Sequence, residues 1–98
     1  MQGTNPTERK INIPDELSEN TVKLVIKFAE AMAEKLHKSE QKYGYSEEWM
    51  LNNWELECKT QLMRHIQKGD PVDVANYCAF MLYHGWSTSP LPPMPEGE

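Results

Sequence analysis

Hydrophobic positions along this chain recur in steps of three and four, which is the spacing of α-helices rather than of strands. The first run follows a possible helix cap at Ser18 or Asn20 and continues to about Tyr43. Its apolar stripe is made of Val25, Phe28, Met32 and Leu36, widened by Leu24, Ala29 and Ala31. Charged residues occupy the opposite face, so the sequence predicts one long amphipathic helix with a solvated side.

Gly44 interrupts that periodicity, and Ser46 can cap a short helical piece that runs through Trp49 and Leu51. Asn52 is followed three residues later by Glu55, which is the form of a capping box. A second helix is therefore predicted over about 53–68. Its apolar stripe is Trp54, Cys58, Leu62 and Ile66, with Met63 alongside.

The densest apolar run lies in residues 69–86, which read GDPVDVANYCAFMLYHGW. Gly69 is suited to end the second helix, and Asp70 with Pro71 is a cap and first position for a third. Gly85 ends this third helix. Apolar residues surround its axis (Val74, Tyr77, Cys78, Phe80, Met81, Leu82 and Tyr83), so we expect it to be buried nearly all round, with the upstream elements packed against it.

These elements predict an all-α fold, a small helical bundle of one long helix, a short connector helix and an antiparallel helical hairpin. The length of 98 residues suits one domain. We expect a polar N-terminal arm over 1–17, the helical domain over 18–86 and a proline-rich, disordered tail over 87–98.

The charge balance of 15 acids against 10 bases gives a net charge of −5, which makes nucleic-acid binding unlikely. No apolar run is long enough for a membrane helix and no signal pattern opens the chain, so we expect a soluble, cytoplasmic protein. Cys58 and Cys78 are interpreted as reduced, buried side chains, with a disulfide as the open alternative.

Motifs for nucleophiles and phosphate loops are missing from the sequence, and His37, His65 and His84 are expected to be structural or surface residues. Carboxylates on helices remain, among them Glu57, Asp70 and Asp73. Acids three apart share a helix face, and hard oxygen ligands from facing helices are what Mg²⁺ requires. The alternative is that Asp70 is only a cap, Asp73 only a first-turn acid and Glu57 only a solvated side chain.

The order of features resembles the MazG-like all-α nucleoside triphosphate pyrophosphohydrolases, particularly their small phage and prophage members. The resemblance covers roughly residues 28–85. It depends on a long helix that ends at Lys42-Tyr43-Gly44, on the ECKTQL segment from Glu57, on the Gly69-Asp70 turn and on the string Asp73-Val74-Ala75-Asn76-Tyr77.

This resemblance implies a Mg²⁺ cofactor and a nucleoside triphosphate substrate. It implies Glu57, Asp70 and Asp73 as metal ligands, with Glu57 and Asp73 catalytic. The substrate-binding residues would be Lys42 or Lys59 near phosphates, Trp49 or Trp54 against a base, and Asn76. The acidic motif is degenerate, because Cys58 and Gln61 stand where the family has further acids.

The register of the hairpin decides between two interpretations of these acids. At about 1.5 Å per residue, Glu57 lies about 18 Å back from Gly69, whereas both aspartates lie within about 6 Å of the turn. A symmetric hairpin places Glu57 opposite about Met81 and leaves no metal site. A bent hairpin or a second subunit would instead bring Glu57 to the aspartates.

Two hypotheses for the function follow from the sequence. One is a MazG-like nucleotide-binding protein that acts as a Mg²⁺-dependent pyrophosphohydrolase. The other is a catalytically eroded interaction protein, a phage accessory factor that binds a host protein. A homodimer is expected in either case, because Tyr77, Phe80 and Tyr83 give the last helix more apolar surface than one hairpin covers.

Overall fold

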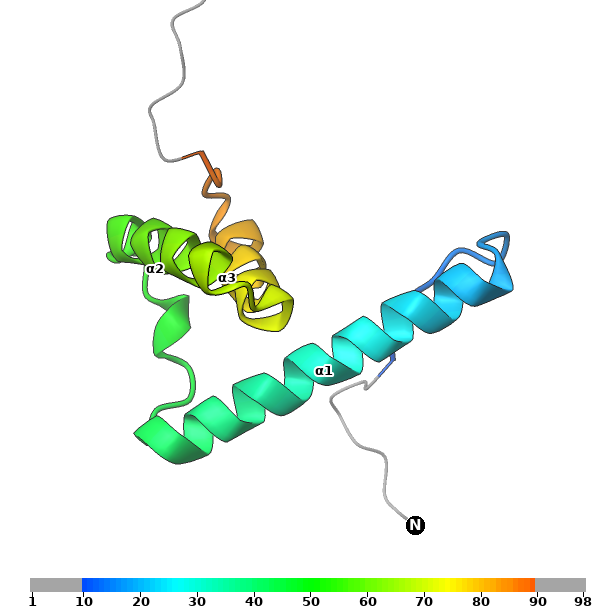
Figure 1. Ribbon diagram of the computed structural model, residues 1–98, viewed down its shortest axis with the longest axis horizontal. Helices are drawn as coiled ribbons and strands as arrows, with labels where there is room; N and C mark the ends of the chain where they lie inside the picture. Colours follow the sequence, from blue (N-terminus) through cyan, green and yellow to red (C-terminus); the bar gives the residue numbers. More distant parts are fainter. Residues whose placement is uncertain (1–9, 90–98) are drawn as a thin grey trace, which may run out of the picture.

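The computed structural model describes residues 10–89, and within that range the fold is all-α without a strand. The long helix α1 spans Glu19–Tyr43, and a single 3-10 turn, η1, spans Glu48–Met50. The hairpin consists of α2, Glu55–Lys68, and α3, Pro71–His84. Figure 1 shows the hairpin lying across one half of α1, with the connector joining them at the end of α1. The predicted order of elements is confirmed.

The helix ends follow from local chemistry. Gly44 and Gly69 adopt left-handed φ values of 75° and 81°, which let the chain leave α1 and α2 at little cost. The side chain of Asp70 accepts hydrogen bonds from the backbone N–H groups of Val72 and Asp73. The predicted cap and first-position proline of α3 are therefore confirmed.

The predicted capping box at Asn52 is wrong. The helix α2 has Trp54 as its N-cap residue and gains no side-chain cap. Trp54 instead donates a hydrogen bond from its indole Nε1–H to the backbone carbonyl of Trp49, at 3.2 Å. This hydrogen bond to the connector positions the start of the helix. Local cap preference is worth only about 1 kcal/mol, and packing of a large aromatic side chain can override it.

The core lies between α2 and α3 and is small. Among the described residues, the buried hydrophobic side chains are Cys58, Leu62 and Met81. Cys58 Sγ of α2 lies 3.9 Å from the backbone oxygen of Tyr77 of α3, so the two helices meet at this point of the core. Both cysteines are free; Cys58 is buried as predicted, whereas Cys78 is only partly buried. Burial raises the pKa of Cys58 to about 11.

The helix α3 is less buried than the sequence predicts. Only Asn76 and Met81 are buried within it, whereas Leu82 is 85% and Tyr83 is 55% exposed. The expectation of burial nearly all round is wrong, because α1 and α2 cover two sides of α3 and leave a third uncovered.

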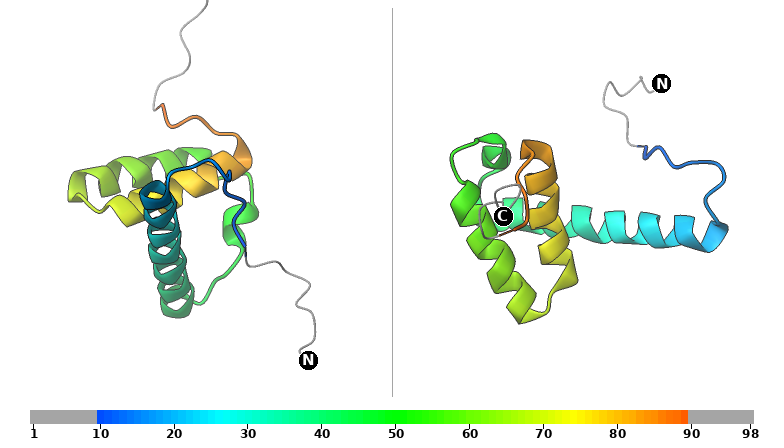
Figure 2. Two further views of the ribbon diagram at one scale, coloured as in Figure 1. Left: turned by 90° about the vertical axis from the view of Figure 1, so that its right-hand side faces the viewer. Right: turned by 90° about the horizontal axis from the view of Figure 1, so that it is seen from above.

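The right-hand view of Figure 2 shows α1 projecting well beyond the hairpin at its N-terminal end. No residue of α1 is buried. The arm and tail predictions for 1–9 and 90–98 lie outside the described residues. Within 10–89, no helix is both long and apolar enough to cross a membrane.

Two leucines of α2 test this assignment of the core. Leu62 is 3% exposed and Leu56 is 80% exposed. We expect Leu62→Ala to lower the free energy of unfolding by about 2–5 kcal/mol, because it removes buried methyl groups and leaves a cavity. Urea unfolding followed by circular dichroism measures this change. Leu56→Ala is the control and should change stability by less than about 0.5 kcal/mol; equal effects of the two variants would contradict the assigned core.

Candidate functional site

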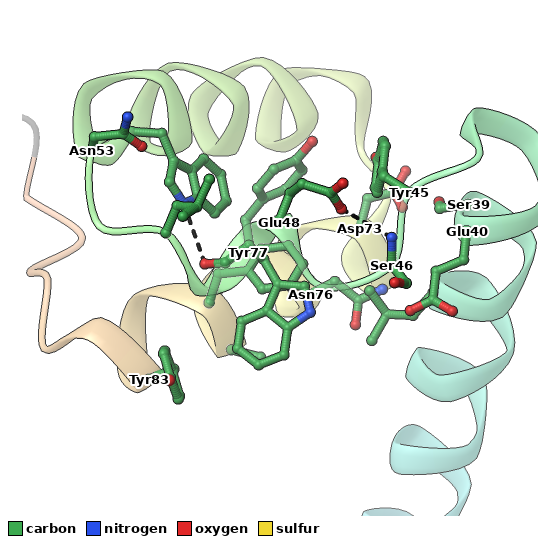
Figure 3. A pocket seen from close by; sticks show the side chains of 16 residues that line it. Ser39, Glu40, Tyr45, Ser46, Glu48, Asn53, Asp73, Asn76, Tyr77 and Tyr83 are labelled. Carbon is green, nitrogen blue, oxygen red and sulfur yellow. Dashed lines mark hydrogen bonds between the residues drawn. The ribbon is translucent and has the colours of Figure 1, made fainter.

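A cavity of about 680 Å³ lies between the C-terminal half of α1, the connector and the face of α3 that points toward them. Figure 3 shows Ser39 and Glu40 reaching it from α1, Tyr45 and Ser46 from the connector, and Asn76 from α3. Its walls are mainly aromatic, contributed by Tyr45, Trp49, Trp54, Tyr77, Phe80 and Tyr83. Its size lies within the usual range for sites that bind small molecules.

Trp49 is held in the cavity wall from several directions. Its backbone carbonyl accepts the Trp54 indole N–H at 3.2 Å and His84 Nε2–H at 2.7 Å. Its ring stacks on Phe80 at a centroid distance of 5.8 Å and meets the ring of Tyr83 nearly perpendicularly at 4.9 Å. An aromatic wall that is fixed in this way loses little conformational entropy when a planar ligand stacks on it.

Asn76 is the polar group that the fold leaves unpaired at this cavity. It is only 4% exposed, and its Oδ1 has no hydrogen-bond partner among the described residues. It lines the cavity together with Tyr77, the hydroxyl of which has its pKa raised by burial. A buried polar atom without a partner costs on the order of 1–3 kcal/mol, so Asn76 is a costly side chain at the wall of this cavity.

Asp70 and Asp73 are bridged by a lysine of α1. Lys35 Nζ lies 3.1 Å from Asp70 Oδ2 and 3.2 Å from Asp73 Oδ1. On the other side, His65 Nε2 of α2 lies 3.8 Å from Asp73 Oδ2. The backbone N–H of Asp73 and the Lys35 ammonium together lower the pKa of Asp70 from its ordinary 3.8 to about 2.

Glu57 does not join these aspartates. It is exposed near the far end of the hairpin and accepts a hydrogen bond from Gln61 Nε2 at 3.0 Å. Within residues 10–89, no group of three or more acidic, histidine or cysteine side chains is arranged to hold a metal ion. The described part of one protomer therefore does not group these carboxylates around a single point, and the Lys35 ammonium already offsets part of the charge of the aspartate pair.

The other predicted substrate residues divide into two groups. Trp49, Trp54 and Asn76 come together around the cavity, and Asp73 lies at its edge. The remaining two lie elsewhere. Lys42 is exposed, with its Nζ 5.2 Å from the ring centroid of its neighbour Tyr43, and Lys59 forms an ion pair with Glu55 at 3.0 Å on α2.

The sequence interpretation missed two features of this region. Tyr77, Phe80 and Tyr83 were assigned to a subunit interface, whereas they line the cavity. An amide at Asn76 within this aromatic stripe is the signal that could have shown it, because a polar side chain in a buried stripe needs a partner. Lys35 was left unassigned; it lies on α1 at the margin of the apolar stripe, where a long side chain can reach a neighbouring helix.

Comparison with known proteins gives no match from which a function could be transferred. The chain matches no protein-family model, no curated protein and no solved structure. The class of protein is therefore defined here by fold and site: a small all-α protein with an aromatic cavity beside a lysine-bridged pair of aspartates.

The lysine-bridged pair predicts a pH dependence of stability. The folded pKa of Asp70 is about 2 and its ordinary value is 3.8, so its stabilising contribution is complete above pH 4 and declines as the pH falls toward 2. We expect Asp70→Asn, which keeps an oxygen to cap α3, to remove part of that decline. Unfolding free energies measured from pH 5 to pH 2 test this. Glu30→Gln, on the solvated face of α1, is the control and should leave the wild-type slope; an unchanged slope in Asp70→Asn would contradict the assignment.

Proposed function

We propose that this protein binds a nucleobase-containing ligand in the cavity between α1, the connector and α3. The observation that carries the proposal is the unpaired Asn76 amide inside a mainly aromatic cavity. Aromatic side chains that present flat faces, together with a few fixed polar groups, are the usual composition of sites for planar heterocycles. The MazG-like resemblance of the sequence points to the same class of ligand.

The aromatic walls supply the affinity in this proposal. Stacking of a base on an aromatic side chain is worth about 1–3 kcal/mol, and it tolerates different bases because each has a flat face. Trp49 is our candidate for stacking on the base, since contacts with Phe80 and Tyr83 fix the orientation of its ring.

Asn76 supplies the orientation. An amide carries an acceptor next to a donor, which is complementary to the Watson–Crick or Hoogsteen edge of a base. Its Oδ1 is buried and has no partner, so we expect the side chain to turn toward the cavity and to accept a hydrogen bond when a ligand edge with an N–H group enters. A ligand without such a group would leave the amide unpaired and would bind more weakly.

The charges around the cavity constrain the rest of the ligand. Glu40, Glu48 and Asp73 are among its lining residues, and these acids would repel an unshielded triphosphate. We therefore expect a nucleoside to bind more tightly than the free triphosphate. Magnesium in solution, which chelates the phosphates, should reduce that difference.

Substitution of Asn76 separates binding from folding. We expect Asn76→Leu to weaken nucleoside binding about tenfold or more, because the N–H of the ligand loses its acceptor. The same change should raise the free energy of unfolding of the unliganded protein by about 1 kcal/mol or more, because an unpaired buried amide is removed. Tryptophan fluorescence titration with a panel of nucleosides and urea unfolding measure the two effects.

The exposed Asn52 provides the matched control. Asn52→Leu should alter neither nucleoside binding nor stability appreciably. Retained affinity in Asn76→Leu, or absence of binding by every nucleoside to the folded wild type, would refute the proposal.

Magnesium-dependent release of pyrophosphate from a nucleoside triphosphate is the second candidate. The position of Asp73 favours it, since this carboxylate lines the cavity as well as facing Lys35. If it holds, wild-type protein releases pyrophosphate only with Mg²⁺, and Asp73→Asn removes the activity. Folded protein that binds nucleosides and releases no pyrophosphate from any triphosphate would exclude catalysis and leave the binding function intact.

A further inference from the structure

The N-terminal half of α1 carries an apolar face that the rest of the described chain leaves largely uncovered. Residues of α1 from Ala31 onward line the two cavities beside the hairpin or form the Lys35 ion pairs. Residues 19–30 make about 18 Å of helix. Figure 1 and the right-hand view of Figure 2 show this end of α1 extending past the hairpin. We call residues 19–30 the overhang.

Large apolar side chains are exposed along the overhang. Leu24 is 66% exposed, Phe28 is 42% and Val25 is 38%. These side chains continue the stripe that Met32 and Leu36 carry toward the hairpin, where both are partly buried. The same face of one helix is therefore covered at its C-terminal end and exposed at its N-terminal end.

Residues 10–18 do not change this picture. They turn back beside the start of α1, and Ile13 and Leu17 are partly buried. Leu24 and Phe28 keep the exposures given above with that segment in place.

We infer that a second copy of this chain covers the overhang, in a two-fold symmetric dimer in which each overhang packs on the other. In such an isologous interface both protomers contribute the same surface, so the overhang of each copy covers the overhang of the other. This inference concerns assembly and does not depend on any ligand in the cavity.

The need for further burial favours a second copy over a different protein. Three buried hydrophobic side chains are few for a chain that orders residues 19–43, 55–68 and 71–84 as helices. The missing apolar burial must come from a partner that is present whenever the chain folds, and a second copy meets that condition.

The chemistry of the face agrees with an obligate interface. Its positions in the overhang are Thr21, Val22, Leu24, Val25, Phe28 and Ala29, and none of them is charged. Homodimer interfaces are more apolar than transient ones, in which polar and charged groups are more frequent. Lys23, Lys27 and Glu30 lie on the opposite side and would stay in water.

Light scattering on the full chain, across a roughly hundredfold range of concentration, tests the inference. We expect a mass of twice 11.4 kDa and a melting temperature that rises with concentration. The double variant Leu24→Glu with Phe28→Glu should be monomeric. If that variant loses helicity, the alanine pair Leu24→Ala with Phe28→Ala keeps the helix and should dissociate at a concentration tenfold or more above wild type.

Lys23→Glu is the matched control, because it changes the net charge by the same two units on the side of the overhang opposite the apolar face. It should leave the dimer intact. A wild-type chain that is folded and monomeric throughout the range would overturn the inference. A dimer that both Leu24/Phe28 variants leave unchanged would overturn it as well, because the interface would then lie elsewhere.

Discussion

The backbone carbonyl of Trp49 accepts hydrogen bonds from two side chains, and the arrangement of the molecule depends on this junction. Trp54 at the start of α2 and His84 at the end of α3 both donate to it, at 3.2 Å and 2.7 Å. The two donors lie at the start of α2 and at the end of α3, so these two hydrogen bonds join the connector to the open end of the helical hairpin. The connector in turn leads directly from α1. The junction holds the ring of Trp49 in the wall of the cavity between the C-terminal half of α1, the connector and α3.

Stability and the proposed binding function make opposite demands on the side chain at position 76. A hydrophobic residue at position 76 would extend the apolar contacts of α3, whereas the amide lies unpaired and buried. Proteins retain such costs at functional sites, where a ligand restores the missing interaction. The free-energy cost of the unpaired Asn76 oxygen is large relative to what so small a core can supply. The proposed burial of the overhang in a dimer would offset part of this cost.

Lys35 changes the interpretation of Asp70 and Asp73, which the sequence predicts as metal ligands. A pair of acids three apart can coordinate a cation, and here the cation is an ammonium group from the neighbouring helix. The interaction fixes the crossing point of α1 on the hairpin beside the cavity. Because all three side chains are partly exposed to solvent, we assign this cluster a positioning role and attribute most of the stability to the core between α2 and α3.

Much of the fold could be predicted from the sequence because its signals are local. Gly44, Gly69, Asp70 and Pro71 determine where helices end and begin through backbone conformation and capping, which do not depend on distant residues. The candidate site could be predicted only in part. Trp49, Trp54 and Asn76 were recognised, whereas Lys35 and the cavity role of Phe80 were missed.

What the sequence determined by itself is the set of helices, their ends and the antiparallel hairpin, since 3.6-residue periodicity and capping are properties of contiguous residues. Only the tertiary structure decided which apolar stripes are covered. The angle between α1 and the hairpin follows from the Trp49 junction, which joins residues 35 positions apart. The register of the hairpin separates Glu57 from the aspartates. The angle places Asn76 at a cavity and leaves Leu24 and Phe28 exposed, because periodicity indicates that a face is apolar and does not indicate what lies opposite it.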